Sequence, residues 1–170
     1  MNHRRQMSVQ LSPLTINWDE QTEVEEQLRR EGFEILDRLH ITLRLYDPDA
    51  RLIQHLTASL EKIATRHRRL TLKVSGLEMF KDKGIVYLHI EKTRELKALR
   101  AEIVNLTTRS SWASVVMDWQ WTPHISIARE KPNTQQEHWK HLPRQGGAVI
   151  AEWLEFLDWD SLDKQYRFVT

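Results

Sequence analysis

The sequence predicts an α+β protein with mainly antiparallel sheet, folded as one domain over residues 1–170. Three observations support this class. Short runs of alternating apolar residues predict strands, and longer runs with apolar residues three and four apart predict helices. Some strands adjoin as hairpins whereas others are joined through helices. No linker or low-complexity segment divides the chain.

The first third of the chain predicts a helix, a strand and a second helix. The first helix is expected over residues 17–32, where Asn17 or Asp19 can cap its start and Gly32 can end it. Alternating apolar residues then predict a single strand over 35–45 with one buried face. Asp47-Pro48 suits the start of the second helix, which carries an apolar stripe made of Leu52, Ile53, Leu56, Leu60, Ile63 and Ala64.

The rest of the chain predicts a hairpin, a third helix and a series of strands. The hairpin joins 70–77 to 84–90 through the turn "KDKG", in which Gly84 suits a positive φ. Thr93 is expected to cap the third helix, which runs to Leu106. The remaining predicted elements are strands over 114–121 and 122–130, a short helix over 133–142, and strands over 147–159 and 165–170.

Composition excludes several classes of protein. With 25 basic and 24 acidic side chains, no overall field draws the chain towards nucleic acid or a membrane, so any basic site must be local. The absence of cysteine excludes disulfides, thiol catalysis and cysteine-ligated zinc. No secretory signal or run of about 20 apolar residues is present. The expectation is therefore a cytoplasmic, monomeric protein with no membrane partner.

One short phrase occurs twice, as "HITL" and later as "HISI". On a strand, residues two apart project from the same face, about 7 Å from one another. His40 and Thr42 are therefore expected to point together, away from the apolar face, as are His124 and Ser126. A third triplet, His55-Leu56-Thr57, falls in a predicted helix, where residues two apart diverge by roughly 200° and cannot form such a pair.

The two phrases resemble the motifs of the two-histidine (2H) phosphoesterase superfamily, which includes RNA 2′,3′-cyclic phosphodiesterases and 2′-5′ RNA ligase-like proteins. Pro123 before the second histidine and Arg129 after it fit the bacterial branch, and Ser126 stands where threonine is commoner. The resemblance extends from about Val9 to Val169. It implies two pseudo-duplicated lobes with outer helices, which face each other across a central cleft and contribute one motif each.

Residues of these types can break a phosphodiester without a metal. Two imidazoles with pKa values of about 6.5 can supply a general base and a general acid. We assign His124 as the base that activates water and His40 as the acid that protonates the departing ribose oxygen. The hydroxyls of Thr42 and Ser126 would bind the phosphate. Since neither motif has Asp or Glu at ligand spacing, no metal or other cofactor is expected.

An arginine should assist at the phosphate, and the sequence offers more than one. The resemblance points to Arg129, although strand alternation places it on the buried face with Ile125 and Ile127. By the same alternation, Arg44 and Arg38 lie on the face of His40. Arg129 and Arg44 are therefore the two substrate-binding candidates.

Two functions remain open at this stage. The first is a metal-independent phosphodiesterase that hydrolyses 2′,3′-cyclic or 2′-5′-linked phosphodiesters of RNA ends or nucleotides. The alternative is a non-catalytic RNA- or nucleotide-binding module on the same scaffold. Binding by such a module would survive the loss of both histidines. Substrate specificity is expected in the loops 81–84, 109–113 and 130–147.

Overall fold

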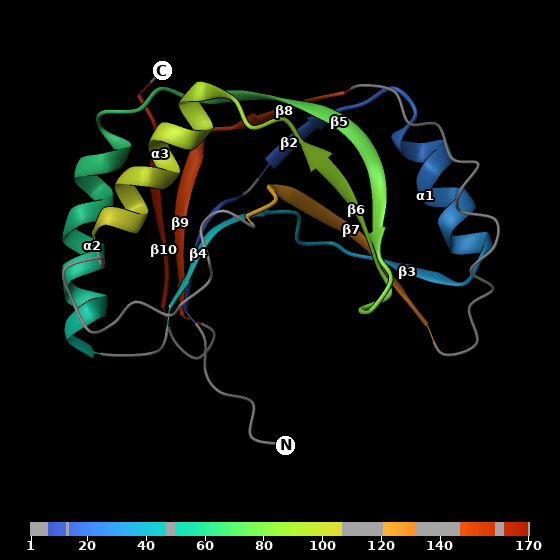
Figure 1. Cartoon of the computed structure of the whole chain (residues 1–170), viewed down its shortest axis with the longest axis horizontal. Coiled ribbons are helices and arrows are strands. Elements are labelled where there is room, and N and C mark those ends of the chain that lie inside the picture. Colours follow the sequence, from blue (N-terminus) through green and yellow to red (C-terminus); the bar gives the residue numbers. More distant parts are fainter. Residues whose placement is uncertain are drawn as a thin grey trace.

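The computed structural model describes residues 7–12, 14–46, 50–106, 121–131, 147–158 and 162–169. Within these ranges it confirms the α+β class, with two antiparallel sheets and three helices (Figure 1). The helices are α1 (Gln21–Arg30), α2 (Ala50–Ala64) and α3 (Arg94–Asn105). No helix in the described part of the chain combines the length and apolar character needed to cross a membrane.

The first sheet has four strands, in the order β10-β9-β1-β4. They are β1 (Met7–Leu11), β4 (Ile41–Tyr46), β9 (Trp153–Asp158) and β10 (Leu162–Arg167). Helix α2 packs on β9 and β10, and α3 packs on β4, so both helices cover the outer face of this sheet (Figure 1). The core between them includes fully buried Val9 and Phe156.

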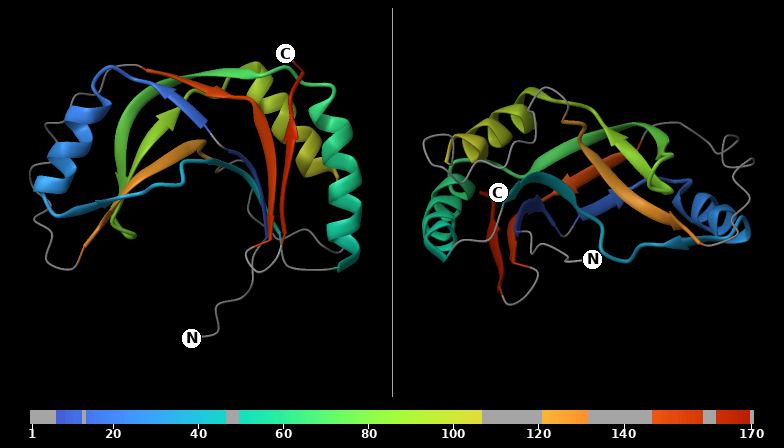
Figure 2. Two further views of the ribbon diagram at one scale, coloured as in Figure 1. Left: turned by 180° about the vertical axis from the view of Figure 1, so that it is seen from behind. Right: turned by 60° about the horizontal axis from the view of Figure 1, so that its bottom comes forward.

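The second sheet has six strands, in the order β2-β8-β5-β6-β7-β3. They are β2 (Leu14–Asn17), β3 (Phe33–Ile35), β5 (Leu70–Phe80), β6 (Ile85–Ile90), β7 (His124–Glu130) and β8 (Ala148–Ala151). Helix α1 packs beside β3 at the end of the molecule opposite α2 and α3 (Figure 2). The second histidine motif lies in β7, and the first lies at the start of β4.

The two sheets are not built from the two halves of the chain. Strand β4 of the first half pairs with β1, which in turn pairs with β9 from the C-terminal end. Conversely, β2 and β3 from the N-terminal part join the sheet that holds β7. The predicted lobes therefore each hold one motif, but their strands are interleaved along the sequence.

Two predicted strands prove to be pairs of strands. The strand expected over 35–45 is wrong, because β3 ends at Ile35 in one sheet and β4 begins at Ile41 in the other. The apolar alternation continues through Leu39 although the chain passes between sheets. The strand expected over 147–159 is likewise divided at Glu152 into β8 and β9.

Other boundaries also differ from the sequence predictions. The first helix begins at Gln21, and residues 14–17 form β2, so neither Asn17 nor Asp19 caps the helix; its N-cap is Glu20, whose side chain makes no capping hydrogen bond. Thr93 does cap α3, since its hydroxyl accepts a hydrogen bond from the backbone N–H of Leu96. The predicted strand 114–121, apart from Trp121, and the predicted helix 133–142 lie outside the described residues.

The predicted hairpin is confirmed between β5 and β6, with Gly84 at a φ of 60°. A Cβ atom added to Gly84 would lie 2.6 Å from Oε2 and 2.8 Å from Cβ of Glu130. The backbone N–H of Glu130 donates to the carbonyl of Gly84 at 2.7 Å, so β7 passes close to this turn. Any side chain at Gly84 would therefore strain the turn and displace β7.

We expect Gly84→Ala to lower the free energy of unfolding by about 1–3 kcal/mol, because alanine disfavours a positive φ and its Cβ would collide with Glu130. Urea denaturation followed by circular dichroism measures this difference. Gly76→Ala is the matched control in the same hairpin, since an added Cβ there has nothing within 4 Å. Equal unfolding free energies for the two variants would contradict the expectation.

Candidate active site

The two motif histidines are held by the same backbone contact. His40 Nδ1 lies 3.3 Å from the carbonyl oxygen of Arg38, and His124 Nδ1 lies 2.8 Å from that of Thr122. In both cases the partner precedes the histidine by two residues. Because a carbonyl oxygen only accepts hydrogen bonds, Nδ1 carries the hydrogen in each ring. The neutral ring then has its lone pair on Nε2, which is the atom that can exchange a proton with a substrate.

The histidines come from different sheets yet lie near each other. His40 directly precedes β4, and His124 is the first residue of β7. Both side chains are half-buried. Strands β4 and β7 contact each other, and the positive charge of His124, when protonated, lowers the pKa of His40. The fold therefore brings the two repeated phrases together, although they lie far apart in the sequence.

Burial is the main reason why the pKa of each imidazole lies below its ordinary value. Nearby charges differ between the two rings. Lys83 and His89 lower the pKa of His124 further. Around His40, Arg38 and His124 lower the pKa, whereas the carboxylate of Glu155 raises it. Among the described residues, a carboxylate thus favours the protonated form of His40 but not that of His124.

A hollow of about 420 Å³ opens between β4 and β7. We call it the cationic hollow, because three of its lining side chains, Arg44, Lys83 and Arg100, carry positive charge. The two lobes therefore meet at a cleft, as the resemblance implied. The lining residues are Thr42, Leu43, Arg44, Leu45, Phe80, Lys83, Arg100, Trp121, Thr122 and His124. A concave site lined by several cations suits an anionic ligand. Because the chain as a whole has a net charge of only +1, this attraction is local to the hollow.

Arg100 and Trp121 form a wall of the hollow that is attached to β4. Arg100 is 9% exposed, and its Nε donates to the carbonyl of Leu43 at 3.2 Å. Its guanidinium carbon lies 4.4 Å from the centre of the Trp121 ring. Trp121 Nε1 in turn donates to the carbonyl of Thr42 at 3.1 Å. Sequence reasoning missed Arg100, although an arginine within the apolar stripe of a helix was an available signal.

A bulge in β4 changes the predicted position of Arg44. Val9 of β1 pairs with Arg44 and Gln10 pairs with Thr42, so Leu43 is an extra residue in β4. The prediction that Arg44 lies on the outward face while Leu45 is buried is therefore wrong: Arg44 is 6% exposed and Leu45 is half-buried. Both residues line the cationic hollow.

A second bulge, in β7, reverses the alternation argument about Arg129. Val86 of β6 pairs with Ala128 and Tyr87 pairs with Ser126, which leaves Ile127 as the extra residue. Arg129 consequently lies on the face of His124 and Ser126, not on the buried face. Its side chain is exposed.

Some of the predicted site residues line the cationic hollow and others do not. Thr42, Arg44 and His124 line the cationic hollow. His40, Ser126 and Arg129 are not among its described lining residues. Ser126 is half-buried opposite Tyr87 in β6, farther along β7.

Two aromatic residues that sequence reasoning did not single out support His124. Phe80 and Tyr87 stack with their ring centres 4.0 Å apart. The His124 imidazole meets both rings edge-to-face, at 5.0 Å from Phe80 and 5.3 Å from Tyr87. The hydroxyl of Tyr87 donates to Glu78 at 2.6 Å, which fixes the stack from the far side. The imidazole is thereby oriented by its backbone contact and by the two aromatic rings.

No cluster of three or more His, Asp or Glu side chains suitable for a metal occurs among the residues that the structure describes. The described groups of the site are imidazoles, hydroxyls, cations and aromatic rings. Such groups suit proton transfer and anion binding.

Solved structures of low sequence identity share this fold. Escherichia coli LigT in complex with 3′-AMP aligns with a TM-score of 0.57 and 16% identity over 97% of this chain and 95% of that one. TT0787 of Thermus thermophilus aligns with a TM-score of 0.56 and 15% identity over 89% and 86% of the two chains. The MHV ns2 PDE domain aligns with a TM-score of 0.54 and 12% identity over 97% of this chain and 99% of that one.

Comparison with curated proteins gives no match to this sequence. By contrast, the family model of the 2′-5′ RNA ligase superfamily matches residues 17–160. That range contains both histidine motifs and most of the chain, which confirms the resemblance to the 2H phosphoesterases. This protein therefore belongs to the 2′-5′ RNA ligase superfamily.

Proposed function

We propose that this protein is a metal-independent phosphodiesterase that hydrolyses 2′,3′-cyclic or 2′-5′-linked phosphodiesters of RNA ends or nucleotides. Membership of the family supports a phosphodiesterase or ligase-type activity. The observation that carries the proposal is the matched pair of imidazoles, each with Nδ1 bound to a carbonyl, of which His124 lines a hollow together with three described cations. Two such rings can accept one proton and donate another across one phosphorus atom.

The charges around the rings support a direction for proton transfer. His124, beside Lys83 and His89, is the neutral base that takes a proton from water at Nε2. His40 is assigned as the protonated acid, because the carboxylate of Glu155 partly offsets the lowering of its pKa by burial and by the charge of Arg38. The water oxygen bonds to phosphorus as the bond to the departing ribose oxygen breaks, and His40 Nε2 delivers its proton to that oxygen. The next cycle requires only that a proton return from His124 to His40 through solvent.

The phosphate is proposed to lie in the cationic hollow. Thr42 and Arg44 of β4, which line the hollow, would bind its non-bridging oxygens, and Lys83 and Arg100 would add positive charge. Ser126 and Arg129 would act from β7, on the same face as His124. A nucleotide ligand is supported by the fold relative LigT, whose structures include complexes with 3′-AMP, NADP⁺ and ATP.

A substrate panel tests the proposal. Purified protein is incubated with 2′,3′-cyclic mononucleotides, short RNAs with cyclic ends and 2′-5′-linked dinucleotides, with and without EDTA, and products are identified by mass. We expect a phosphomonoester product at a rate that EDTA does not change. Loss of turnover in EDTA would contradict the metal-independent mechanism. Binding without turnover of any substrate would favour the non-catalytic module instead.

The pH dependence of kcat/KM should reflect the lowered pKa values of both rings. Since burial depresses the pKa of His124, the base stays neutral below the ordinary value of about 6.5. The depressed pKa of His40 means that the acid loses its proton before the pH rises to that value. We therefore expect a bell-shaped profile with its maximum on the acidic side of about pH 6.5. A maximum above neutral pH would contradict this.

A further inference from the structure

Glu155 is a charged side chain in an unusual position. It lies in β9 with a relative exposure of 1%, on the face opposite fully buried Phe156. Its neighbours across the sheet are Gln10 of β1 and Gln165 of β10. Carboxylates are almost never buried to this degree unless other groups pair with them. The mechanism described above assigns this residue no contact with the substrate.

Among the described residues, the side chains of Arg38, Gln165 and Gln10 donate hydrogen bonds to the Glu155 carboxylate. Arg38 Nη2 lies 2.8 Å from Oε1, and Gln165 Nε2 lies 3.2 Å from the same oxygen. Gln10 Nε2 donates to Oε2, and Ser8 donates to the side-chain oxygen of Gln10 at 3.3 Å. The carboxylate thus joins β1, β10 and the link that precedes β4 in a single network. Charge-assisted bonds of this kind are the strong ones in proteins.

Arg38 connects this network to the first motif histidine. Its guanidinium binds Glu155, and its carbonyl oxygen accepts the Nδ1 hydrogen bond of His40 at 3.3 Å. Arg38 belongs to the link of residues 36–40, which lies between β3 and β4 and is part of neither strand. The side-chain contact with Glu155 anchors this link to the four-stranded sheet.

We propose that Glu155 is a positioning residue that acts through Arg38 to hold His40 in place for proton delivery. The proposal rests on the proposed function for its catalytic consequence, but not for its contacts. A buried ion pair is weak evidence of stabilisation, because well-packed apolar residues can often replace one at no loss. The placement of this pair beside His40 therefore points to a role in the site. The described charged groups that act on His40 are Arg38, Glu155 and His124.

Two charge-removing variants should move the pKa of His40 in opposite directions. Glu155→Gln keeps the shape of the side chain but removes the charge that favours the imidazolium, so the pKa should fall. Arg38→Gln removes a charge that opposes the imidazolium, so the pKa should rise. The double variant should lie between them. NMR titration of the His40 ring, assigned with His40→Gln, measures these values, and the His124 ring serves as an internal reference.

Activity provides a second readout. If the pKa of His40 falls by about one unit in Glu155→Gln, the protonated acid is about tenfold scarcer at neutral pH. We therefore expect kcat at neutral pH to fall about tenfold, with little change in KM, and the loss to shrink as the pH is lowered. A purely structural role would lower the stability without this dependence on pH.

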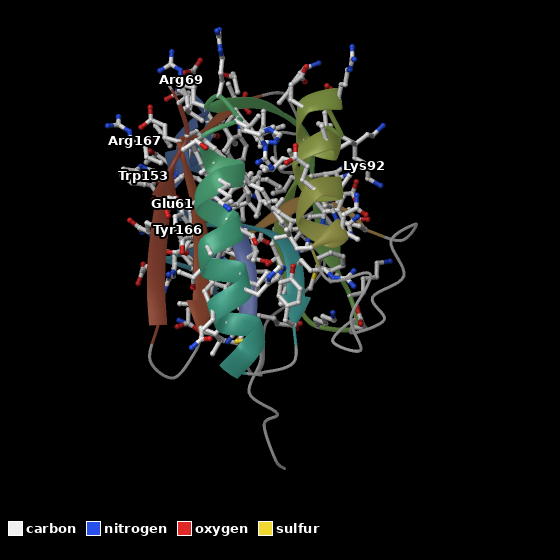
Figure 3. All side chains as sticks on the ribbon, turned by 90° about the vertical axis from the view of Figure 1, so that its left-hand side faces the viewer. Glu61, Arg69, Lys92, Trp153, Tyr166 and Arg167 are labelled. Atoms are coloured by element: carbon white, nitrogen blue, oxygen red, sulfur yellow. The ribbon has the colours of Figure 1, made fainter. Side chains whose placement is uncertain are left out.

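Glu152→Gln is the matched control, at the residue that directly precedes β9. Glu152 pairs with Arg69 at 3.8 Å and with Arg167 at 4.0 Å, and both arginines lie on the outside of the molecule (Figure 3). This variant should leave the pKa of His40 and the activity unchanged. Any effect that Glu155→Gln has and Glu152→Gln lacks therefore comes from the position of Glu155 and not from the loss of one negative charge.

The proposal is overturned if the pKa of His40 stays constant in both Glu155→Gln and Arg38→Gln, or moves in the same direction in both. Should Glu155→Gln fail to fold, Arg38→Gln still decides the matter, because it keeps the Glu155 carboxylate together with the hydrogen bonds that Gln10 and Gln165 donate to it. Opposite shifts in a protein that hydrolyses no phosphodiester would leave the positioning role standing and refute the proposed function.

Discussion

Replacement of either His40 or His124 by alanine should reduce kcat by about 10²–10⁴-fold, the usual contribution of one general acid or base. Each variant leaves the other ring with its own carbonyl contact, so the loss should come from proton transfer and not from collapse of the site. The same substrates that the wild-type protein hydrolyses provide the assay. Combining the two substitutions should add much less than the product of the single effects, because the rings act as a pair.

His55→Ala provides the control for the histidine variants. His55 begins the third His-x-Thr triplet of the chain, but it lies exposed in the middle of α2. Its loss should leave kcat and KM unchanged. Full activity in either motif variant, or an equal loss in His55→Ala, would refute the two-histidine mechanism.

Features that depend on neighbouring residues were predicted well from the sequence. Thr93 caps α3 as expected, and the turn before β6 carries its positive φ at Gly84. Most of the described apolar residues in the stripes of α2 and α3 are buried, including Leu60 and Leu99. Periodicity of this kind involves only residues that are close in the sequence, so a single sequence is enough to detect it.

Features that depend on a distant partner strand were predicted poorly. The extra residues Leu43 and Ile127 each shift the alternation of their strand, and each is defined only by the register of the strand opposite. Because of these two bulges, Arg44 is buried and Arg129 is exposed, the opposite of what strand alternation predicts. The division of residues 35–45 between two sheets has the same origin, because the sequence does not state which strands pair.

The histidine pair was identified by its repetition, whereas its supporting residues were not. Glu155 acts on His40 from β9, and Arg100 reaches Leu43 from α3. Neither lies within a recognisable motif, since each contributes through tertiary contacts with residues far away in the sequence. A buried charge within a mostly apolar strand, or within the apolar stripe of a helix, is the signal that both share.

Arg100→Ala should lower kcat/KM by about 10²–10³-fold, the range observed when one fixed donor to a developing charge is removed. The variant removes a buried cation from the cationic hollow, and it also releases the Trp121 ring that stands against Arg100 at 4.4 Å. Arg100→Lys keeps the charge but lacks the planar guanidinium that binds the Leu43 carbonyl and stacks on the indole. Its activity should therefore lie between those of the wild type and Arg100→Ala.

Arg129→Ala is the informative comparison for this prediction. The Arg129 side chain is exposed, so solvent screens its charge and its removal should change kcat/KM by less than about tenfold. Thermal denaturation of each variant separates a loss of folded protein from a loss of catalysis, since Arg100 also anchors α3 to β4. If Arg129→Ala were the more damaging variant, the phosphate would be bound along β7 towards Ser126. The cationic hollow would then not be the place where the charge develops.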